Sequence, residues 1–176
     1  MNIFVTDPSP YVSAQVLPDK HVVKMPLETC QMLSIVCSHK WGHGYGELHR
    51  INGEPYKTSK GAFSSHPCTQ WAGASLYNTA WLIQHGCALV GEYSHRYGKV
   101  HGCADALFEA KKTFHKFAGE VITCYCMVES FTRAMPDEYK HDTSIDTFTA
   151  YKNYIGSKPW ASSNYLRDPS RKPDWI

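Results

Sequence analysis

Four polar residues whose side chains can take part in proton transfer recur at helical spacing near the N-terminus. His21, Lys24, Glu28 and Gln31 follow one another at steps of three, four and three residues, which places them on one face of a helix. An imidazole, an amine, a carboxylate and an amide in one row can donate, accept and hold protons. The alternative is an exposed ion-paired face, because Lys24 and Glu28 are also an i,i+4 pair. The spacing alone leaves both interpretations open.

The helix that carries this row is predicted from about Asp19 to Ser38. Asp19 is a good N-cap residue, since its carboxylate can accept hydrogen bonds from free backbone N–H groups. The other side of the helix is rich in residues that form protein cores: Val22, Val23, Met25, Leu27, Cys30, Met32 and Leu33. Pro26 removes a backbone donor and predicts a kink or a break close to Glu28.

The remaining segments predict a mainly α protein, a single compact helical domain over residues 1–176 with a short N-terminal extended segment and long loops. Residues 2–6 are predicted as a strand or an extended arm, and residues 41–67 as a long loop. Further helices are predicted over residues 11–17, 69–97 with an interruption at Gly86, 103–117 and 144–155, with Gly98 as a C-cap. Residues 121–127 are predicted as a strand or a buried helical turn.

Composition excludes several classes of protein. A chain of 176 residues with 43% hydrophobic residues can bury a proper core, and it contains neither an apolar run long enough to span a membrane nor a signal-peptide pattern. Seven cysteines, an odd number, favour free thiols and a reducing compartment. We therefore expect a cytoplasmic protein, in the host cell if the gene belongs to a phage.

Motifs for common cofactors are missing. The chain has no glycine-rich phosphate loop, no Gly-x-Ser-x-Gly elbow and no cysteine or histidine spacing typical of zinc sites. We therefore expect no cofactor and no bound metal. The net charge of +2 neither requires nor excludes nucleic acid as a partner.

Two groups of residues are candidates for contacts with nucleic acid. Arg96 and Lys99 belong to a basic cluster that could meet phosphate, with Glu92 orienting the arginine. The alternative is that Glu92 and Arg96, four residues apart, form a structural ion pair. Tyr151 and Tyr154 lie near lysines and could stack on unpaired bases, although aromatics three residues apart on a helix also occur as core residues.

The chain resembles a family of small, mostly uncharacterised phage proteins. The resemblance rests on an opening Asn-Ile-Phe, on Asp-Lys-His-Val-Val-Lys-Met, on His66-Pro67 before a tryptophan-rich helix, on Glu-Tyr-x-x-Arg-Tyr-Gly-Lys and on Ala-Met-Pro-Asp-Glu-Tyr. This match covers nearly the whole chain and implies little about function.

More distantly, the chain resembles the pyrimidine-dimer DNA glycosylases of the phage endonuclease V type. That family has an Asp-x-His, two aliphatic residues and a catalytic glutamate seven residues after the histidine, a pattern matched by Asp19, His21 and Glu28. A later helix with an aromatic-Leu pair, a glutamate and an arginine is matched by Trp81-Leu82, Glu92 and Arg96. The resemblance implies a small all-α enzyme that acts on ultraviolet-damaged DNA.

This resemblance implies a DNA N-glycosylase and AP lyase that attacks damaged or modified pyrimidines with an amine. Glu28 would be the catalytic carboxylate and His21 would orient phosphate or assist proton transfer. The amine would be the α-amine of Asn2, if Met1 is removed, or the side chain of Lys24. The residues expected to contact DNA are Lys20, Gln31, His66, Trp71, Arg96, Lys99, Tyr151 and Tyr154. The expected partner is double-stranded DNA, and we expect a monomer that does not bind membranes.

The sequence departs from that family at important positions. The family usually has threonine at position 2, where this chain has Asn2, and the arginines that flank its catalytic glutamate are replaced by Leu27 and Gln31. Two other functions therefore stay open: a phage enzyme that modifies nucleotides or bases without cutting the strand, and a non-catalytic phage protein that binds nucleic acid.

Overall fold

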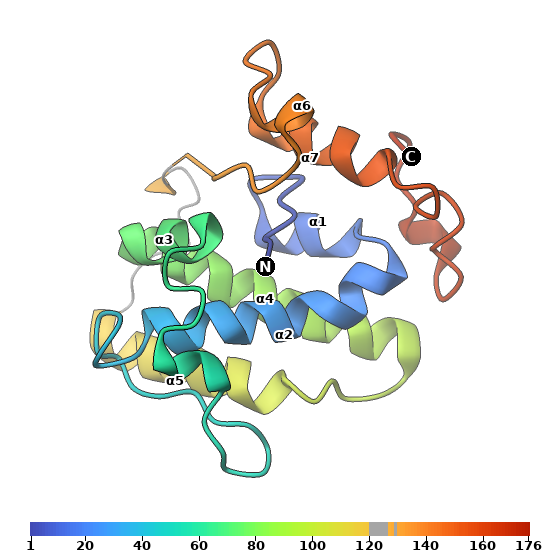
Figure 1. Ribbon diagram of the computed structural model, residues 1–176. Coiled ribbons are helices and arrows are strands. Elements are labelled where there is room, and N and C mark those ends of the chain that lie inside the picture. Colours follow the sequence, from blue (N-terminus) through green and yellow to red (C-terminus); the bar gives the residue numbers. More distant parts are fainter. Residues whose placement is uncertain (120–126, 129) are drawn as a thin grey trace.

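The computed structural model describes residues 1–119, 127–128 and 130–176, and in this part of the chain the fold is mainly α (Figure 1). A strand or a buried helical turn was predicted over residues 121–127, and residues 121–126 of this segment lie outside the described residues. The helices of the described part are α1 Pro10–Gln15, α2 Asp19–Val36, η1 Lys57–Lys60, α3 Pro67–Ala74, α4 Leu76–Tyr97, α5 Ala104–Ala118, α6 Asp137–Lys140, α7 Thr147–Gly156 and η3 Pro169–Arg171.

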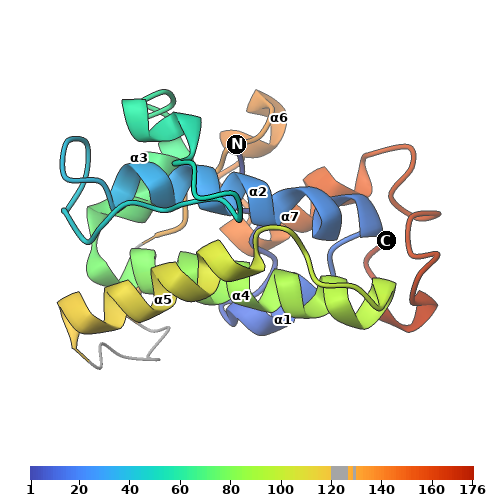
Figure 2. The same cartoon turned by 90° about the horizontal axis from the view of Figure 1, so that it is seen from below.

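The long helix α4 is the centre of the fold. It contacts α1, α2, α3 and α5, and Figure 2 shows α2 and α5 running along it. Its buried residues include Trp81, Leu82 and Leu89, so the apolar faces of the surrounding helices meet around it. None of the helices in the described residues is both long and apolar enough to cross a membrane.

The helix break predicted at Gly86 was wrong. The chain instead breaks at Ser75, which is extended and caps α4 by accepting a hydrogen bond from the N–H of Asn78 (3.1 Å). Helix α4 continues through Gly86 because this glycine allows close packing: a Cβ there would lie 2.8 Å from side-chain atoms of Thr29 and Leu107. Gly98 is the C-cap of α4, as predicted, with φ +63°.

The N-terminal residues form a buried extended arm. Residues 2–6 are all buried, and the main-chain N–H of Thr6 donates to the hydroxyl of Ser13 on α1 (3.0 Å). Phe4 has a φ of +42°, a left-handed conformation that is costly for a side chain of this size. The surrounding contacts therefore hold a sharp turn in the arm, and this turn directs Met1 towards α2.

The beginning of α2 is capped from a distant segment. Pro18 is the N-cap and Asp19 is the first helical residue, so the prediction of Asp19 as N-cap was wrong. Asn164 accepts from the free N–H groups of the first turn: its main-chain oxygen accepts from the N–H of Asp19 (2.8 Å), and its side-chain oxygen accepts from the N–H of Lys20 (2.8 Å). Pro26 does not end the helix, which continues to Val36.

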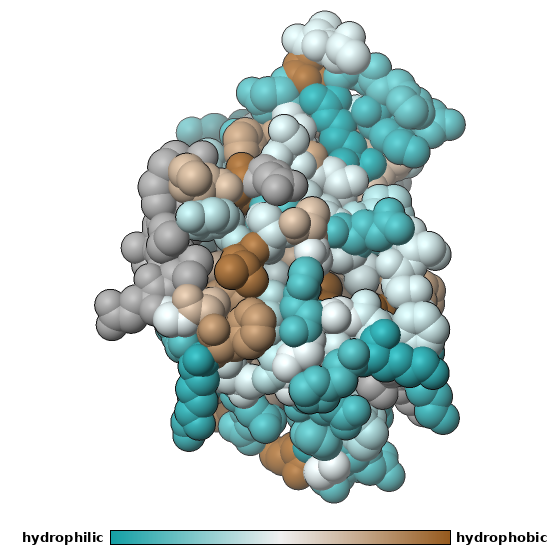
Figure 3. All heavy atoms as spheres, turned by 90° about the vertical axis from the view of Figure 1, so that its left-hand side faces the viewer, coloured by the Kyte–Doolittle hydropathy of each residue, from teal (hydrophilic) through white to brown (hydrophobic). Residues whose placement is uncertain are grey.

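Surface hydropathy is mixed at the end of the molecule that carries α3 and α5. In Figure 3, brown apolar side chains stand in small groups between teal hydrophilic ones on the part of this face that is not grey. Small groups of this kind are ordinary for a folded protein surface. Functional side chains are therefore better sought where polar residues converge.

Candidate active site

A carboxylate with an amine on each side marks the candidate active site. One oxygen of Glu28, Oε1, lies 3.1 Å from Nζ of Lys24, and the other, Oε2, lies 3.9 Å from the α-amine of Met1. The Glu28 side chain is 11% exposed, whereas that of Lys24 is 70% exposed. The site therefore combines a largely buried carboxylate with a nearby amine that is open to solvent.

The side chain of Asn2 holds the arm that carries Met1. Its Oδ1 accepts hydrogen bonds from the N–H groups of Ile3 (2.7 Å) and Phe4 (3.0 Å), and its Nδ2 donates to the main-chain oxygen of Ala134 (2.6 Å). The amide of Asn2 is thus a structural group, and the amine that faces Glu28 in this chain is that of Met1.

An aromatic cluster joins the N-terminal arm, the first turn of α2 and the C-terminal helix α7. Phe4 stacks on His21, with ring centroids 4.1 Å apart, and on Tyr154 at 6.0 Å. Trp160 meets the edge of His21 at 5.4 Å. Lysines lie over the rings: Nζ of Lys158 is 3.9 Å from the Tyr154 centroid and Nζ of Lys20 is 4.6 Å from that of Trp160.

Burial keeps the imidazole of His21 neutral. Burial, together with the smaller effect of the positive charges of Lys158 and Lys24, lowers the pKa of His21 to about 3. Nδ1 of His21 is buried and has no hydrogen-bond partner among the described residues. A neutral imidazole cannot attract phosphate by charge, so any role of His21 in the chemistry depends on hydrogen bonding.

His66 approaches the same site from α3. It is the N-cap of that helix, and its Nδ1 accepts a hydrogen bond from the N–H of Cys68 (3.2 Å). The pKa of His66 is lowered by partial burial and by the charge of the N-terminal amine, while Glu28 acts in the opposite direction. The pKa of His66 therefore responds both to the Met1 amine and to Glu28, and His66 lies on the edge of the site.

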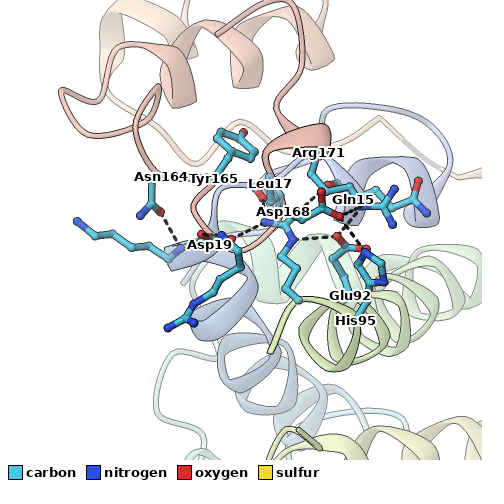
Figure 4. A network of polar contacts seen from close by, with 12 residues as sticks. Gln15, Leu17, Asp19, Glu92, His95, Asn164, Tyr165, Asp168 and Arg171 are labelled. Atoms are coloured by element: carbon cyan, nitrogen blue, oxygen red, sulfur yellow. Dashed lines mark hydrogen bonds and ion pairs between the residues drawn. The ribbon is translucent and has the colours of Figure 1, made fainter. Parts of the chain in front are cut away.

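Arg96 belongs to a buried structural network, and its expected contact with DNA stays a prediction that this burial does not favour. Its guanidinium donates to Glu92 (2.8 Å), to Asp19 (2.9 Å) and to the main-chain oxygens of Leu17 and Gln15 (2.9 and 2.7 Å). The side chain is fully buried. Figure 4 shows this cluster joining α1, α2, α4 and the C-terminal segment.

Arg171 completes this network from the C-terminal segment, since its Nε donates to the same Glu92 oxygen (2.8 Å). The structural alternative that the sequence left open for the Glu92–Arg96 pair is thus the correct one. We call the residues Asp19, Glu92, Arg96 and Arg171 the arginine clamp.

Two aromatic residues expected at the DNA surface are also buried. Trp71 is 6% exposed and packs against Trp81 and Phe131. Tyr151 is fully buried, and its hydroxyl donates to the oxygen of Thr132 (2.9 Å). Both rings are thus part of the protein core in this structure, and their contact with DNA stays a prediction.

The other candidates for DNA contacts are accessible. Lys20 is exposed at the start of α2, Gln31 is half-buried one turn after Glu28, Tyr154 is half-buried on α7, and Lys99 is exposed after the end of α4. Gln31 follows Glu28 by three residues on α2, and Tyr154 stacks on Phe4 of the arm. Their contact with DNA stays a prediction.

Sequence reasoning missed two contributors to the site, Phe4 and the α-amine of Met1. The arm is distant from α2 in sequence, and its hydrophobic residues signal only burial. The sole hint was the Asn-Ile-Phe opening shared with the phage proteins.

Comparison with known proteins identifies the family. The model of the family described as "Pyrimidine dimer DNA glycosylase" matches residues 1–105, which is more than half of the chain. The chain belongs to the pyrimidine dimer DNA glycosylase family. No curated protein and no solved structure matches it.

The segment matched by the glycosylase family contains most of the site. It includes the N-terminal arm and helices α1 to α4, and with them Met1, His21, Lys24, Glu28 and His66. The aromatic side chains of Tyr154 and Trp160 come from the part of the chain beyond the match.

No metal centre is formed by the residues that the structure describes: nowhere among them do three or more His, Cys, Asp or Glu side chains come together in a way that could hold an ion. Cys30, Cys37, Cys68, Cys87 and Cys103 are free thiols.

Proposed function

We propose that this protein is a DNA N-glycosylase with an associated AP lyase activity, which acts on damaged or modified pyrimidines in duplex DNA through an amine nucleophile and Glu28. The observation that carries the proposal is the placement of the Met1 α-amine 3.9 Å from the Glu28 carboxylate, on an arm whose turn is held by Asn2. Membership of the glycosylase family supports DNA as the substrate.

The proposed first step exchanges one bond at the sugar for another. The neutral amine attacks C1′, the bond between C1′ and the damaged base breaks, and the base leaves with a proton. Opening of the sugar ring then yields a Schiff base between the amine and C1′. The Glu28 carboxylate, next to the amine, stabilises the positive charge that develops on the sugar and accepts a proton from the amine.

In the lyase step, removal of a proton from C2′ breaks the bond between C3′ and its oxygen, which leaves with the 3′ phosphate. Water then hydrolyses the Schiff base and regenerates the amine. Glu28 is the nearest carboxylate to both amines, and neutral His21 is available for hydrogen bonding to the sugar or to a water molecule. DNA is held by Lys20, Gln31, His66, Lys99 and Tyr154.

Two amines compete for the role of nucleophile. Lys24 is closer to Glu28, but its side chain is mostly exposed. α-Amines as a class lose their proton at lower pH than lysine side chains, so a larger fraction is nucleophilic near neutral pH. We therefore assign the nucleophile to the α-amine of the arm: that of Met1, or that of Asn2 if Met1 is removed.

Borohydride trapping tests this assignment. The protein is incubated with ultraviolet-irradiated or untreated duplex DNA and sodium borohydride, which reduces a Schiff base to a stable adduct. We expect an adduct with irradiated DNA only, and peptide mapping should locate it on the N-terminal residue in both the wild type and Lys24→Ala. An adduct on Lys24 would overturn the choice of amine, and the absence of any adduct or strand cleavage, including on hypermodified phage DNA, would overturn the proposed function.

A further inference from the structure

A groove of about 470 Å³ lies between the start of α2 and the C-terminal segment, beside the candidate active site. Its apolar surface comes from Val23, Tyr97 and Leu166, and its cations are Lys20, Lys24 and Arg167. Leu166 is 80% exposed and Val23 is 43% exposed. The groove thus combines open apolar side chains with three positive charges.

The carboxylate in this groove is already neutralised. Asp19 lines the groove but is buried, and its two oxygens accept from the guanidinium of Arg96 (2.9 Å) and from the main-chain N–H of Arg167 (3.1 Å). The lysine and arginine side chains are therefore not cancelled by Asp19. A polyanion is the occupant that this charge distribution favours.

The C-terminal wall of the groove is firmly attached to α2. Asn164 caps the helix through two hydrogen bonds of 2.8 Å, and the hydroxyl of Tyr165 donates to the oxygen of Val16 (2.7 Å). Figure 4 shows Asn164 and Tyr165 beside the beginning of α2. The guanidinium of Arg167 lies 5.1 Å from the ring of Tyr97. This wall is built before any ligand arrives, so binding orders few side chains.

The groove adjoins the candidate active site through Lys24. Lys24 lines the groove and pairs with Glu28 at 3.1 Å, and Lys20, one turn earlier, lies over Trp160 of the aromatic cluster. A strand lying in the groove therefore contacts Lys24, the amine that is paired with Glu28.

We propose that this groove binds the deoxyribose-phosphate backbone of duplex DNA adjacent to the reacting nucleotide, an inference that rests on the proposed function. Phosphates pair with Arg167 and Lys20, and the apolar faces of the sugars lie against Leu166 and Val23. Asn164, Leu166 and Arg167 lie beyond residue 105, so this contact is supplied by the part of the chain that the family match does not cover.

Binding of undamaged DNA tests the groove without any need for turnover. Fluorescence anisotropy with a labelled, undamaged duplex, measured from 50 to 200 mM salt, gives the affinity and its salt dependence. For Arg167→Ala we expect about eightfold weaker binding at 0.1 M salt and a slope of log K against log salt that is smaller by about 0.9, the change for one phosphate contact. The matched control is Lys112→Ala on α5, which lies away from the C-terminal segment in both Figure 1 and Figure 2.

Two further variants separate the charge from the fold. Arg167→Lys keeps the charge and should keep the salt slope of the wild type. Leu166→Glu places a carboxylate in the groove at a mostly exposed position, so the fold should survive while binding weakens at least as much as in Arg167→Ala. Arg167→Ala itself preserves the main-chain N–H that holds Asp19, and thermal unfolding should confirm this.

The proposal would be overturned if Arg167→Ala and Leu166→Glu bound DNA as the Lys112→Ala control does. It would also be overturned if Arg167→Lys were as weak as Arg167→Ala, or if polyglutamate displaced the duplex at equal charge. Borohydride trapping is scored separately. If the wild type forms no adduct but the groove variants lose binding, the proposed function is refuted and the groove proposal stands. If the wild type forms an adduct and the groove variants bind DNA normally, the groove proposal is refuted and the proposed function stands.

Discussion

Two pairs of charged residues with the same helical spacing have different environments in this protein. Lys24 and Glu28 on α2, and Glu92 and Arg96 on α4, are both i,i+4 pairs with a largely buried carboxylate. In the arginine clamp, the guanidinium of Arg96 is fully buried and donates to two carboxylates and two main-chain oxygens. At Glu28, one amine is mostly exposed and the other lies at 3.9 Å.

This difference shows that the burial of the basic partner distinguishes an ion pair with a structural role from one whose groups are available for chemistry. A guanidinium whose donors are used by the protein has little capacity left for a substrate, and removing it leaves buried carboxylates without a partner. A carboxylate that is paired with a solvent-exposed amine, as Glu28 is with Lys24, can exchange that amine for a substrate at small cost. The clamp therefore stabilises the fold, and the Glu28 site has groups available for chemistry.

The largest effect is expected for Glu28→Gln. General acid–base groups contribute about 100-fold to 10,000-fold to rates, so the single-turnover rate on the substrate identified by trapping should fall at least about 100-fold. The free energy of unfolding should change by less than about 1 kcal/mol, because the ion pair with Lys24 is exposed on one side. Glu109→Gln, on the exposed face of α5, is the control, and a Glu28→Gln rate within threefold of that control would contradict the comparison.

Arg96→Met should have the opposite profile. Loss of one partner of a buried ion pair costs about 3 to 5 kcal/mol, and urea unfolding should detect a loss of this size. Arg171→Met removes the half-buried cation that shares Glu92 and should cost less than about 1 kcal/mol. If Arg96→Met weakened DNA binding while its unfolding free energy stayed at the wild-type value, Arg96 would be a DNA contact after all.

A smaller effect that distinguishes the candidate active site from the arginine clamp is the pH dependence of the free energy of unfolding. The pKa of His21 is about 3 in the folded protein, and that of an unfolded histidine is about 6.5. Between these values the unfolded chain binds more protons, so the free energy of unfolding falls as the pH is lowered, by about 1.4 kcal/mol per pH unit from this residue. Above pH 6.5 the contribution is constant.

His21→Phe should make this decline shallower by that amount while keeping the stacking on Phe4. The comparison is a series of urea unfolding curves between pH 4 and 7, with His115→Gln, an exposed histidine on α5, as the control. An unchanged slope in His21→Phe would mean that His21 is charged in the folded protein. The site would then contain a buried charged basic side chain, as the arginine clamp does with Arg96.

Much of the helical architecture follows from local patterns. The helices predicted over residues 19–38 and 103–117 are observed over residues 19–36 and 104–118, and Gly98 is the predicted C-cap, because apolar spacing and capping residues act over a few positions. The break at Ser75 was missed since Gly86 is the stronger local breaker. Gly86 instead allows close packing against Thr29 and Leu107 of other helices. No local sequence pattern can reveal such a contact.

The same limit applies to the site. Helical periodicity predicted that His21, Lys24 and Glu28 share a face, and the resemblance to the glycosylases added the expected role of Glu28. Neither predicted that the arm would turn at Phe4 and bring the Met1 amine to Glu28, or that Asn164 would cap α2. Those contacts join residues that are far apart in the chain.

The sequence by itself determined which residues share a helical face, because neighbours three and four positions apart are brought together by the helix alone. Only the tertiary structure decided which of these faces is closed and which is open. Arg96 is enclosed because α1, α2, α4 and the C-terminal segment converge on it. Glu28 has one amine that is open to solvent, on Lys24, and a second that the N-terminal arm brings to it. Such burial is settled by the packing of segments distant in sequence.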